Sequence, residues 1–194
     1  MCGAMHFNIT WLPPSNAIIV VVKEIYIDGR CIMENRLEAL RIEIDRMIFE
    51  KQPEKIRFFI EHLYSVARYC SLLALKRNLN PELAMTSGML HDIYRVTDNI
   101  AENHDVMGAK RATEILKAMI LYNDEEIAII STAISRHCDK SSIHEPYDEI
   151  LKDADVLSHC FYNPDFPIDK GEVERYKNVL DELGLSPAKR LGGM

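Results

Sequence analysis

The spacing of apolar residues along the chain predicts a helical body preceded by a short β-type segment. Residues 17–28 (AIIVVVKEIYID) are rich in β-branched side chains and end at Asp28-Gly29, which is typical of a strand followed by a turn. From Asn35 onward, apolar residues recur at helical intervals. Prolines fall where helices begin or end, at Pro53, Pro81, Pro146 and Pro164. We therefore expect helices near residues 35–51, 54–77, 81–94, 104–121, 124–138, 147–162 and 171–183.

This pattern divides the 194 residues into three parts. Residues 1–32 form an N-terminal extension in which we expect a strand, and the sequence leaves open whether this extension belongs to the native fold. Residues 33–183 form an all-α body of a size that fits one domain. Residues 184–194 contain several glycines and a proline, which predicts a flexible tail.

Composition and charge restrict the classes of partner. Charged residues make up 27% and hydrophobic residues 47%, which is typical of an ordered globular protein. The net charge of −7 argues against an extended nucleic-acid surface or binding to an anionic membrane. The longest apolar run, residues 17–22, is far shorter than the roughly 20 residues of a membrane-spanning helix.

Cysteine usage and the N-terminal residues point to a reducing compartment. Residues 1–16 contain no Lys or Arg and so lack the basic start of a signal peptide. The five cysteines are odd in number and form no CxxC pair, which disfavours both a disulfide framework and a zinc ribbon. The expected location is the cytoplasm. These cysteines are Cys2, Cys31, Cys70, Cys138 and Cys160.

Histidines occupy inward or border positions on four successive predicted helices. His62 lies at the edge of an apolar stripe, whereas His91, His104 and His137 lie on faces expected to pack against other helices. A single inward histidine is most often a hydrogen-bonded core residue. Four of them, with Asp92 beside His91, instead predict a metal site. Imidazole and carboxylate donors suit divalent transition metals: Mn, Fe, Co, Ni or Zn.

A further carboxylate is expected from residues 149–159 (EILKDADVLSH). Both Asp153 and Asp155 lie well away from the centre of the apolar side of this helix. Periodicity therefore does not choose between them, and two solvated surface acids remain an alternative. The apolar side is defined by Ile150, Ala154, Leu157 and Phe161.

In this order and setting, the residues resemble the HD superfamily of metal-dependent phosphohydrolases. The resemblance rests on His62, the His91-Asp92 pair and the segment KDADVL, and it covers about residues 55–162. It implies an HD-domain helical bundle. By matching KDADVL to the ADxL helix of the family, it also selects Asp155 over Asp153 as the fourth metal ligand.

Two more features resemble a subgroup of that family that binds two metal ions. HDVMGAKRA, at 104–112, resembles the HxxxGA element, and His137 resembles a later histidine of the subgroup that includes bacterial diadenosine tetraphosphate hydrolases. This implies that Asp92 bridges two ions, with His104 and His137 on the second. No GYP triplet is present, which disfavours the activity of the related HD-GYP cyclic dinucleotide phosphodiesterases. Only eight residues separate Arg95 from His104, where the diadenosine tetraphosphate hydrolases carry a longer insertion, so dinucleotide specificity is not inherited.

The resemblance also implies an activity. Arg95 occupies the basic position of an HDxxK/R pattern and would face substrate phosphate, so Asp92 and Arg95 are the predicted catalytic residues. The implied reaction is cleavage of a phosphate ester or anhydride, in a nucleotide or another phosphorylated small molecule, by metal-activated water. A nucleotide-sensing module with little turnover and a purely structural helical domain remain alternatives. Whether the chain forms a homodimer is also open.

Other ionisable side chains near the predicted ligands receive less weight. Arg136 and Lys140 flank the last metal histidine, and we expect both to be solvated. A supporting role behind the ligands is the less favoured interpretation of His144 and His159. We expect no role for His6.

Overall fold

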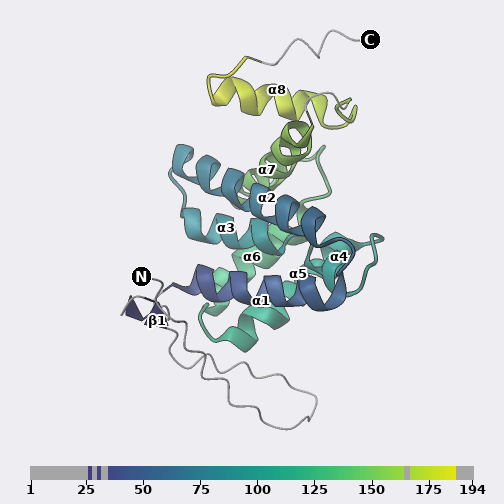
Figure 1. The fold of residues 1–194 in the computed structure, drawn as a ribbon. Helices are drawn as coiled ribbons and strands as arrows, with labels where there is room; N and C mark the ends of the chain where they lie inside the picture. Colours follow the sequence, from purple (N-terminus) through teal and green to yellow (C-terminus); the bar gives the residue numbers. More distant parts are fainter. Residues whose placement is uncertain (1–25, 28–29, 32–34, 164–166, 187–194) are drawn as a thin grey trace, which may run out of the picture.

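The computed structural model describes residues 26–27, 30–31, 35–163 and 167–186 (Figure 1). Within these ranges the chain forms one two-stranded hairpin followed by eight helices. In the hairpin, Tyr26 pairs with Cys31 and Ile27 with Arg30 in antiparallel register. The elements are β1 (Tyr26–Ile27), β2 (Arg30–Cys31), α1 (Arg36–Lys51), α2 (Ile56–Lys76), α3 (Pro81–Leu90), α4 (Ile93–Thr97), α5 (His104–Met119), α6 (Asp124–Arg136), α7 (Pro146–Tyr162) and α8 (Val173–Glu182).

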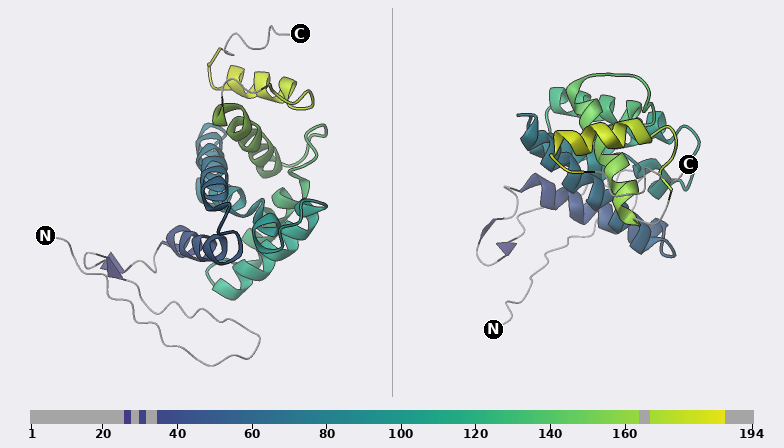
Figure 2. Two further views of the ribbon diagram at one scale, coloured as in Figure 1. Left: turned by 45° about the vertical axis from the view of Figure 1, so that its right-hand side comes forward. Right: turned by 90° about the horizontal axis from the view of Figure 1, so that it is seen from above.

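The helices pack as a bundle around α2 and α3. Helix α2 lies against α3 and α7, and α6 contacts α3, α5 and α7. Helix α8 crosses α7 at the end of the molecule opposite α1 (Figures 1 and 2). The expected all-α bundle is confirmed. None of the described helices is long and apolar enough to cross a bilayer.

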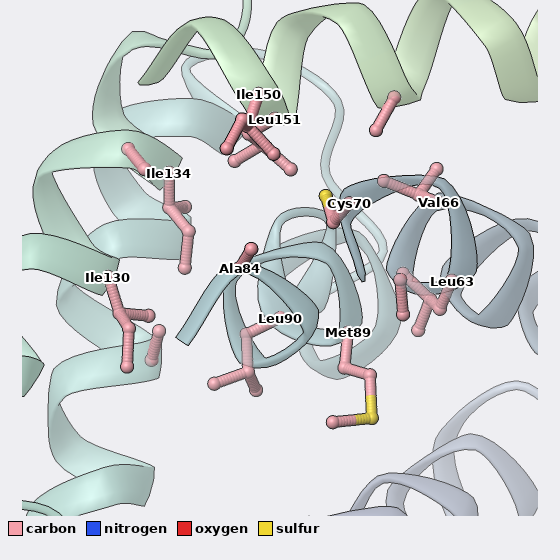
Figure 3. Packing of buried hydrophobic residues seen from close by; sticks show 14 of the residues in the cluster. Leu63, Val66, Cys70, Ala84, Met89, Leu90, Ile130, Ile134, Ile150 and Leu151 are labelled. Atoms are coloured by element: carbon pink, nitrogen blue, oxygen red, sulfur yellow. The ribbon is translucent and has the colours of Figure 1, made fainter. Parts of the chain in front are cut away.

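The core lies where α2, α3, α6 and α7 meet. Figure 3 shows side chains from all four helices interdigitating, and each labelled residue is buried. Burial of this apolar surface is the main favourable term that holds the helices together. The labelled residues are Leu63, Val66, Cys70, Ala84, Met89, Leu90, Ile130, Ile134, Ile150 and Leu151.

Local signals place the helix starts where the sequence predicts them. The side chains of Asn35, Asn80 and Asn123 each accept a hydrogen bond from a backbone N–H in the first turn of the helix that follows. Pro81 and Pro146 occupy the first turn of α3 and α7, where the missing N–H costs nothing. The expected helices near residues 35–51, 124–138 and 147–162 are thus confirmed within a few residues.

The expected continuous helix over residues 81–94 is wrong. Helix α3 ends at Leu90 and α4 begins at Ile93, with Asp92 at φ −104° and ψ 17° between them. The physical cause is local, since His91 Nδ1 lies 2.8 Å from the Gly88 carbonyl and donates to it. A side chain that bonds its own backbone competes with the helical ladder. The break gives His91 and Asp92 directions that a straight helix does not offer.

Parts of the sequence predictions lie outside the described residues. The strand expected over 17–28 falls within them only at Tyr26–Ile27, which does form a strand. The rest of that segment, the tail beyond residue 186, and His6 are not described.

Helix α3 lies in close contact with the backbone of α2 at Gly88. A Cβ atom at this position would lie 2.7 Å from Ala67 Cα and 2.8 Å from Ala67 N, both of them backbone atoms. We therefore expect Gly88→Ala to lower the free energy of unfolding by about 1–3 kcal/mol, because the helices must separate. Urea unfolding measures this change. Gly171→Ala is the control, since its Cβ would meet only the Asp169 side chain, and equal stability of the two variants would contradict the close approach.

Candidate metal centre

A pocket of about 510 Å³ brings together the predicted site residues from four helices, α2, α4, α5 and α7, and from the connections that follow α3 and α6. We call it the central pocket. All seven residues selected from the sequence line it: His62, His91, Asp92, Arg95, His104, His137 and Asp155. Cys138, Lys140, His159 and Glu172 also line it.

Four donor atoms form one compact set, which we call the first donor group: His62 Nε2, His91 Nε2, Asp92 Oδ2 and Asp155 Oδ1. The two imidazole nitrogens are 3.1 Å apart. His62 Nε2 lies 3.5 Å from Asp92 Oδ2 and 3.6 Å from Asp155 Oδ1. The corresponding distances from His91 Nε2 are 3.8 and 3.7 Å. Donors arranged tetrahedrally about an ion at about 2.0–2.1 Å stand roughly 3.3 Å apart, so each imidazole is spaced for coordination with the other imidazole and with each carboxylate oxygen.

The other oxygen of Asp92 faces a second donor group, formed by His104, His137 and Asp92 Oδ1. Asp92 Oδ1 is 3.2 Å from His104 Nε2 and 3.9 Å from His137 Nε2. One carboxylate therefore presents one oxygen to each group. This is the arrangement expected of a carboxylate that bridges two cations.

Hydrogen bonds behind the rings fix which nitrogen of each imidazole carries the proton. In His91, His104 and His137, Nδ1 lies 2.7–2.8 Å from the backbone carbonyl three residues earlier in the chain. A carbonyl only accepts, so Nδ1 bears the proton and Nε2 presents a lone pair to the central pocket. Such support is typical of metal-binding histidines.

The tautomer of His62 follows from a chain of hydroxyl groups. Ser65 Oγ donates to the His62 carbonyl at 3.0 Å, which uses its one proton. Ser158 Oγ must then donate to Ser65 Oγ, and His62 Nδ1 must donate to Ser158 Oγ at 3.3 Å. His62 Nε2 therefore also carries a lone pair, and this lone pair faces the lone pair of His91 Nε2 directly. A cation between the two nitrogens would remove that repulsion.

Burial keeps His91 and His137 neutral, and nearby charge keeps the two carboxylates ionised. Burial lowers the pKa of His91 to about 3 and also lowers the pKa of His137. Burial alone would raise the pKa of Asp92, but the Arg95 guanidinium beside it holds the pKa below its usual range. For Asp155, burial is likewise outweighed, chiefly by the Lys140 ammonium.

Two carboxylate oxygens have no hydrogen-bond donor among the described residues. Asp92 Oδ1 and Asp155 Oδ1 are buried and unpaired, and each belongs to one of the donor groups. Buried polar atoms are normally satisfied, so an orphaned oxygen calls for an ion or a water. The neutral nitrogens and ionised oxygens present here fit divalent transition metals.

The structure distinguishes the two aspartates that helical periodicity could not separate. Both are buried, at 6% exposure for Asp153 and 5% for Asp155, so the alternative of solvated surface acids is wrong. Asp153 accepts from Arg77 and Arg175, at 2.5 and 2.7 Å, on the far side from the metal donors. Asp155 faces the central pocket, in agreement with the family resemblance.

Lys140 also differs from its expectation. It is not solvated, because its Nζ lies 2.7 Å from Asp155 Oδ2 and the side chain is only 14% exposed. Arg136 is partly solvated as expected, with 40% of its side chain exposed, but it also donates at 2.8 Å to the buried carboxylate of Asp148. The sequence did not reveal these ion pairs, because both acidic partners, Asp148 and Asp155, lie on the following helix, α7.

Arg95 reaches the metal donors although the helix does not continue through Asp92. Its Nη1 donates to Asp92 Oδ2 at 2.6 Å, and about a third of its side chain remains exposed to the central pocket. The guanidinium therefore has further N–H donors available for an anion.

Sequence reasoning gave too little weight to His159 and overlooked Cys138. The His159 ring stacks on His62 with centroids 5.4 Å apart, and its Nε2 lies 3.4 Å from Asp155 Oδ1. Its Nδ1 is 3.2 Å from Glu172, which lies in the connection before α8. His144 instead contacts Lys152 at 2.6 Å, away from the pocket lining. The i, i+4 spacing of Asp155 and His159 is the signal that could have found His159.

Cys138 lies beside the second donor group. Its Sγ is 3.4 Å from His104 Nε2 and 3.5 Å from His137 Nε2. Partial desolvation and the carboxylate of Asp105 raise the pKa of this thiol to about 12, so it is not a free reactive thiolate.

Comparison with known proteins supports the family resemblance. The family model described as the HD domain matches residues 59–159. An uncharacterized protein of Clostridium beijerinckii is 35% identical over 115 residues, which cover 57% of this chain and 70% of that protein. Ribonuclease Y of Chlorobium luteolum is 29% identical over 99 residues, covering 51% of this chain but only 17% of that enzyme.

A solved structure shares the fold. The crystal structure of a predicted HD superfamily hydrolase from an uncultured Thermotogales bacterium matches with a TM-score of 0.51, at 22% identity, over 77% of this chain and 95% of that one. At this identity the likeness concerns the fold alone. The narrower resemblance to the subgroup with two ions stays a prediction.

The two aspartates of α7 allow a matched test of the metal centre. Asp155→Ala should lower the amount of bound divalent metal, because it removes a charged donor, and should leave the bundle folded. Asp153→Ala should retain the metal but lower the free energy of unfolding by on the order of 2 kcal/mol, since Arg77 and Arg175 lose a shared buried partner. Elemental analysis and urea unfolding measure the two effects, and the reverse pattern would place the metal on the other face of α7.

Proposed function

Because the chain belongs to the HD domain family, we propose that it is a metal-dependent phosphohydrolase acting on a nucleotide or another phosphorylated small molecule. The observation that carries the proposal is the convergence of four imidazole lone pairs and two unpaired carboxylate oxygens on one pocket. A purely structural domain would not need this arrangement, which destabilises the fold unless a cation is present.

The donor groups support a centre for two divalent ions, drawn from Fe, Mn, Co, Ni and Zn. His62, His91, Asp92 and Asp155 would hold one ion, and His104, His137 and Asp92 would hold the other. When bound, such ions lower the pKa of a water molecule and neutralise charge that develops on phosphoryl oxygens.

The protein side chains would provide the binding of the phosphate group. Arg95 and Lys140 line the pocket beside the two metal-facing carboxylates and give it positive charge at its wall. Arg95 can offer paired N–H donors to two oxygens of one phosphate, whereas Lys140 offers a point charge. The carboxylate of Asp92 would hold Arg95 close to the reacting phosphate.

Size and charge favour a small substrate. A volume of about 510 Å³ is within the range of small-molecule sites. The net charge of −7 disfavours a long polynucleotide, which would meet repulsion beyond the pocket. Since ribonuclease Y is among the relatives, short RNA still belongs in the set of substrates to be tested.

Turnover of a phosphate panel tests the proposal. Protein loaded with Mn²⁺, Fe²⁺, Co²⁺, Ni²⁺ or Zn²⁺ is assayed against phosphomonoesters, phosphodiesters, nucleoside polyphosphates and a short RNA, with Asp92→Ala as the inactive control. Hydrolysis that depends on both metal and Asp92 would support the proposal. Metal and nucleotide binding without turnover would instead indicate the sensing module.

The number of ions is tested by removing one donor of the second group. Wild-type protein should bind close to two ions per chain, and His104→Ala should lower this toward one, because Asp92 Oδ1 and His137 alone hold an ion weakly. Elemental analysis after dialysis gives the stoichiometry. His144→Ala removes a histidine outside the central pocket and should leave two ions bound. A wild-type value of one, unaffected by His104→Ala, would refute the two-ion centre.

Arg95 tests the phosphate-binding role. Arg95→Ala should lower kcat/KM by about 100-fold, equivalent to about 2.7 kcal/mol of transition-state stabilisation, with metal content unchanged. Arg95→Lys should recover only part of this, since a point charge replaces a fork. Arg111, which pairs with Asp98 and Glu114 outside the pocket lining, is the matched control. Kinetics within twofold of wild type for both Arg95 variants would remove Arg95 from the mechanism.

A further inference from the structure

Cys138 lies beside the two imidazoles of the second donor group. Its Sγ stands 3.4 Å from His104 Nε2 and 3.5 Å from His137 Nε2. Nitrogen and sulfur donors arranged tetrahedrally, at about 2.0–2.1 and 2.3 Å from an ion, stand roughly 3.5–3.6 Å apart. The thiol therefore lies where a third protein ligand of one ion would be.

The end of α6 makes this position accessible to two neighbouring residues. On a continuing helix, successive side chains point about 100° apart and do not face one hollow. Helix α6 ends at Arg136, and the chain then turns, with Asp139 N donating to the Arg136 carbonyl. His137 and Cys138 can therefore both face the central pocket, and both line it.

An independent observation points to a ligand at the same place. Asp92 Oδ1 faces the same imidazoles, belongs to a residue that is 1% exposed, and has no hydrogen-bond donor among the described residues. An ion between these atoms would satisfy this oxygen. The set would then consist of two nitrogens, one sulfur and one oxygen.

We propose that Cys138 is a thiolate ligand of the ion held by His104, His137 and Asp92, and that this position selects a thiophilic ion, Zn²⁺, Co²⁺ or Fe²⁺, over Mn²⁺ or Mg²⁺. Soft sulfur donors favour these ions, whereas sites built from oxygen favour the harder ones. When the ion binds, the S–H proton is released to solvent and the sulfur lone pair forms the bond to the metal. The inference rests on the proposed metal centre and deepens it.

The first donor group offers an internal contrast. Its four donors are imidazole nitrogens and carboxylate oxygens, and the metal-sized clusters that include Cys138 contain His104 and His137 only. The two positions would therefore differ in metal preference. A mixed centre, with a thiophilic ion on one side and a harder ion on the other, is the expected state.

Cobalt substitution tests the thiolate bond directly. Metal-free full-length protein is titrated with Co²⁺, and the near-ultraviolet thiolate-to-cobalt charge-transfer band is recorded together with the amount of bound metal. Wild type should show the band, and Cys138→Ser should lose it while remaining folded by circular dichroism. Cys160→Ser removes a buried thiol that does not line the pocket and should keep the band. A band of unchanged intensity in Cys138→Ser, or cobalt bound at two per chain in wild type without a band, would overturn the proposal.

Alkylation gives a second readout that needs no variant. The raised pKa of Cys138 slows its alkylation, so metal-free protein is treated with iodoacetamide for a long time at alkaline pH. Cys138 is exposed, whereas Cys70 and Cys160 are buried, so Cys138 should be the one modified of these three. Loading with Zn²⁺ should protect it, as measured by mass spectrometry of the peptide that contains it. Equal modification with and without Zn²⁺ would contradict coordination.

Metal preference is the third readout. In competition dialysis, Cys138→Ser should lose Zn²⁺ affinity at one site by about 100-fold or more, because loss of a supporting partner outside the coordination sphere already costs 10–100-fold. Its affinity for Mn²⁺ should change little, and an unchanged preference for Zn²⁺ would count against the thiolate.

Turnover measured on the same samples separates this inference from the proposed function. Phosphate-ester hydrolysis without a thiolate band would leave the hydrolase in place and remove Cys138 from the centre. A thiolate band without hydrolysis would support Cys138 as a metal ligand and contradict the proposed hydrolase activity.

Discussion

Imidazole nitrogens and carboxylate oxygens whose lone pairs have no proton donor converge in the central pocket. The rest of the structure holds these atoms in place despite their mutual repulsion. His62 Nε2 and His91 Nε2 face each other at 3.1 Å, and hydrogen bonds behind both rings keep their protons on Nδ1. Each of those hydrogen bonds ends on backbone or on the Ser158–Ser65 pair, so neither ring can turn its N–H inward without leaving a buried acceptor unpaired. The histidines are therefore preorganised for a cation rather than for one another.

The bundle holds this arrangement through a second layer of charges, on the other side of α7. Asp153 joins Arg77, which directly follows α2, to Arg175 of α8, and Glu149 joins Arg175 to the fully buried Lys152. Lys152 in turn donates to the Ser142 carbonyl in the loop that follows α6. Lys140 lies in the same loop. The polar interior of α7 thus fixes the helix that supplies Asp155 and the loop that supplies the cation opposite it.

The sequence predicts much of this because helical periodicity depends on the same packing that buries the histidines. His62, His91 and His137 are buried as their helical positions indicate. Asp153 and Asp155 escape prediction because their partners Arg77, Arg175 and Lys140 come from other elements, and a helical wheel carries no information on long-range ion pairs. The break in the helix at His91-Asp92 is not predicted, because a side chain, rather than a glycine or proline, interrupts the backbone hydrogen bonds of the helix. The position of Cys138 beside the donor atoms is not predicted, because helical periodicity does not apply beyond the end of α6.

Charge balance links the metal centre to the substrate. The two carboxylates are paired with two cations, Arg95 on Asp92 Oδ2 and Lys140 on Asp155 Oδ2. Divalent ions at the two donor groups would add positive charge that these carboxylates cannot offset, so the loaded pocket carries an excess that favours an anion. Arg95 and Lys140 would also be held less tightly, because a metal competes for the same carboxylates. Both side chains would then be available to a phosphate group, and the cations that pair with these carboxylates would become the ones that bind substrate.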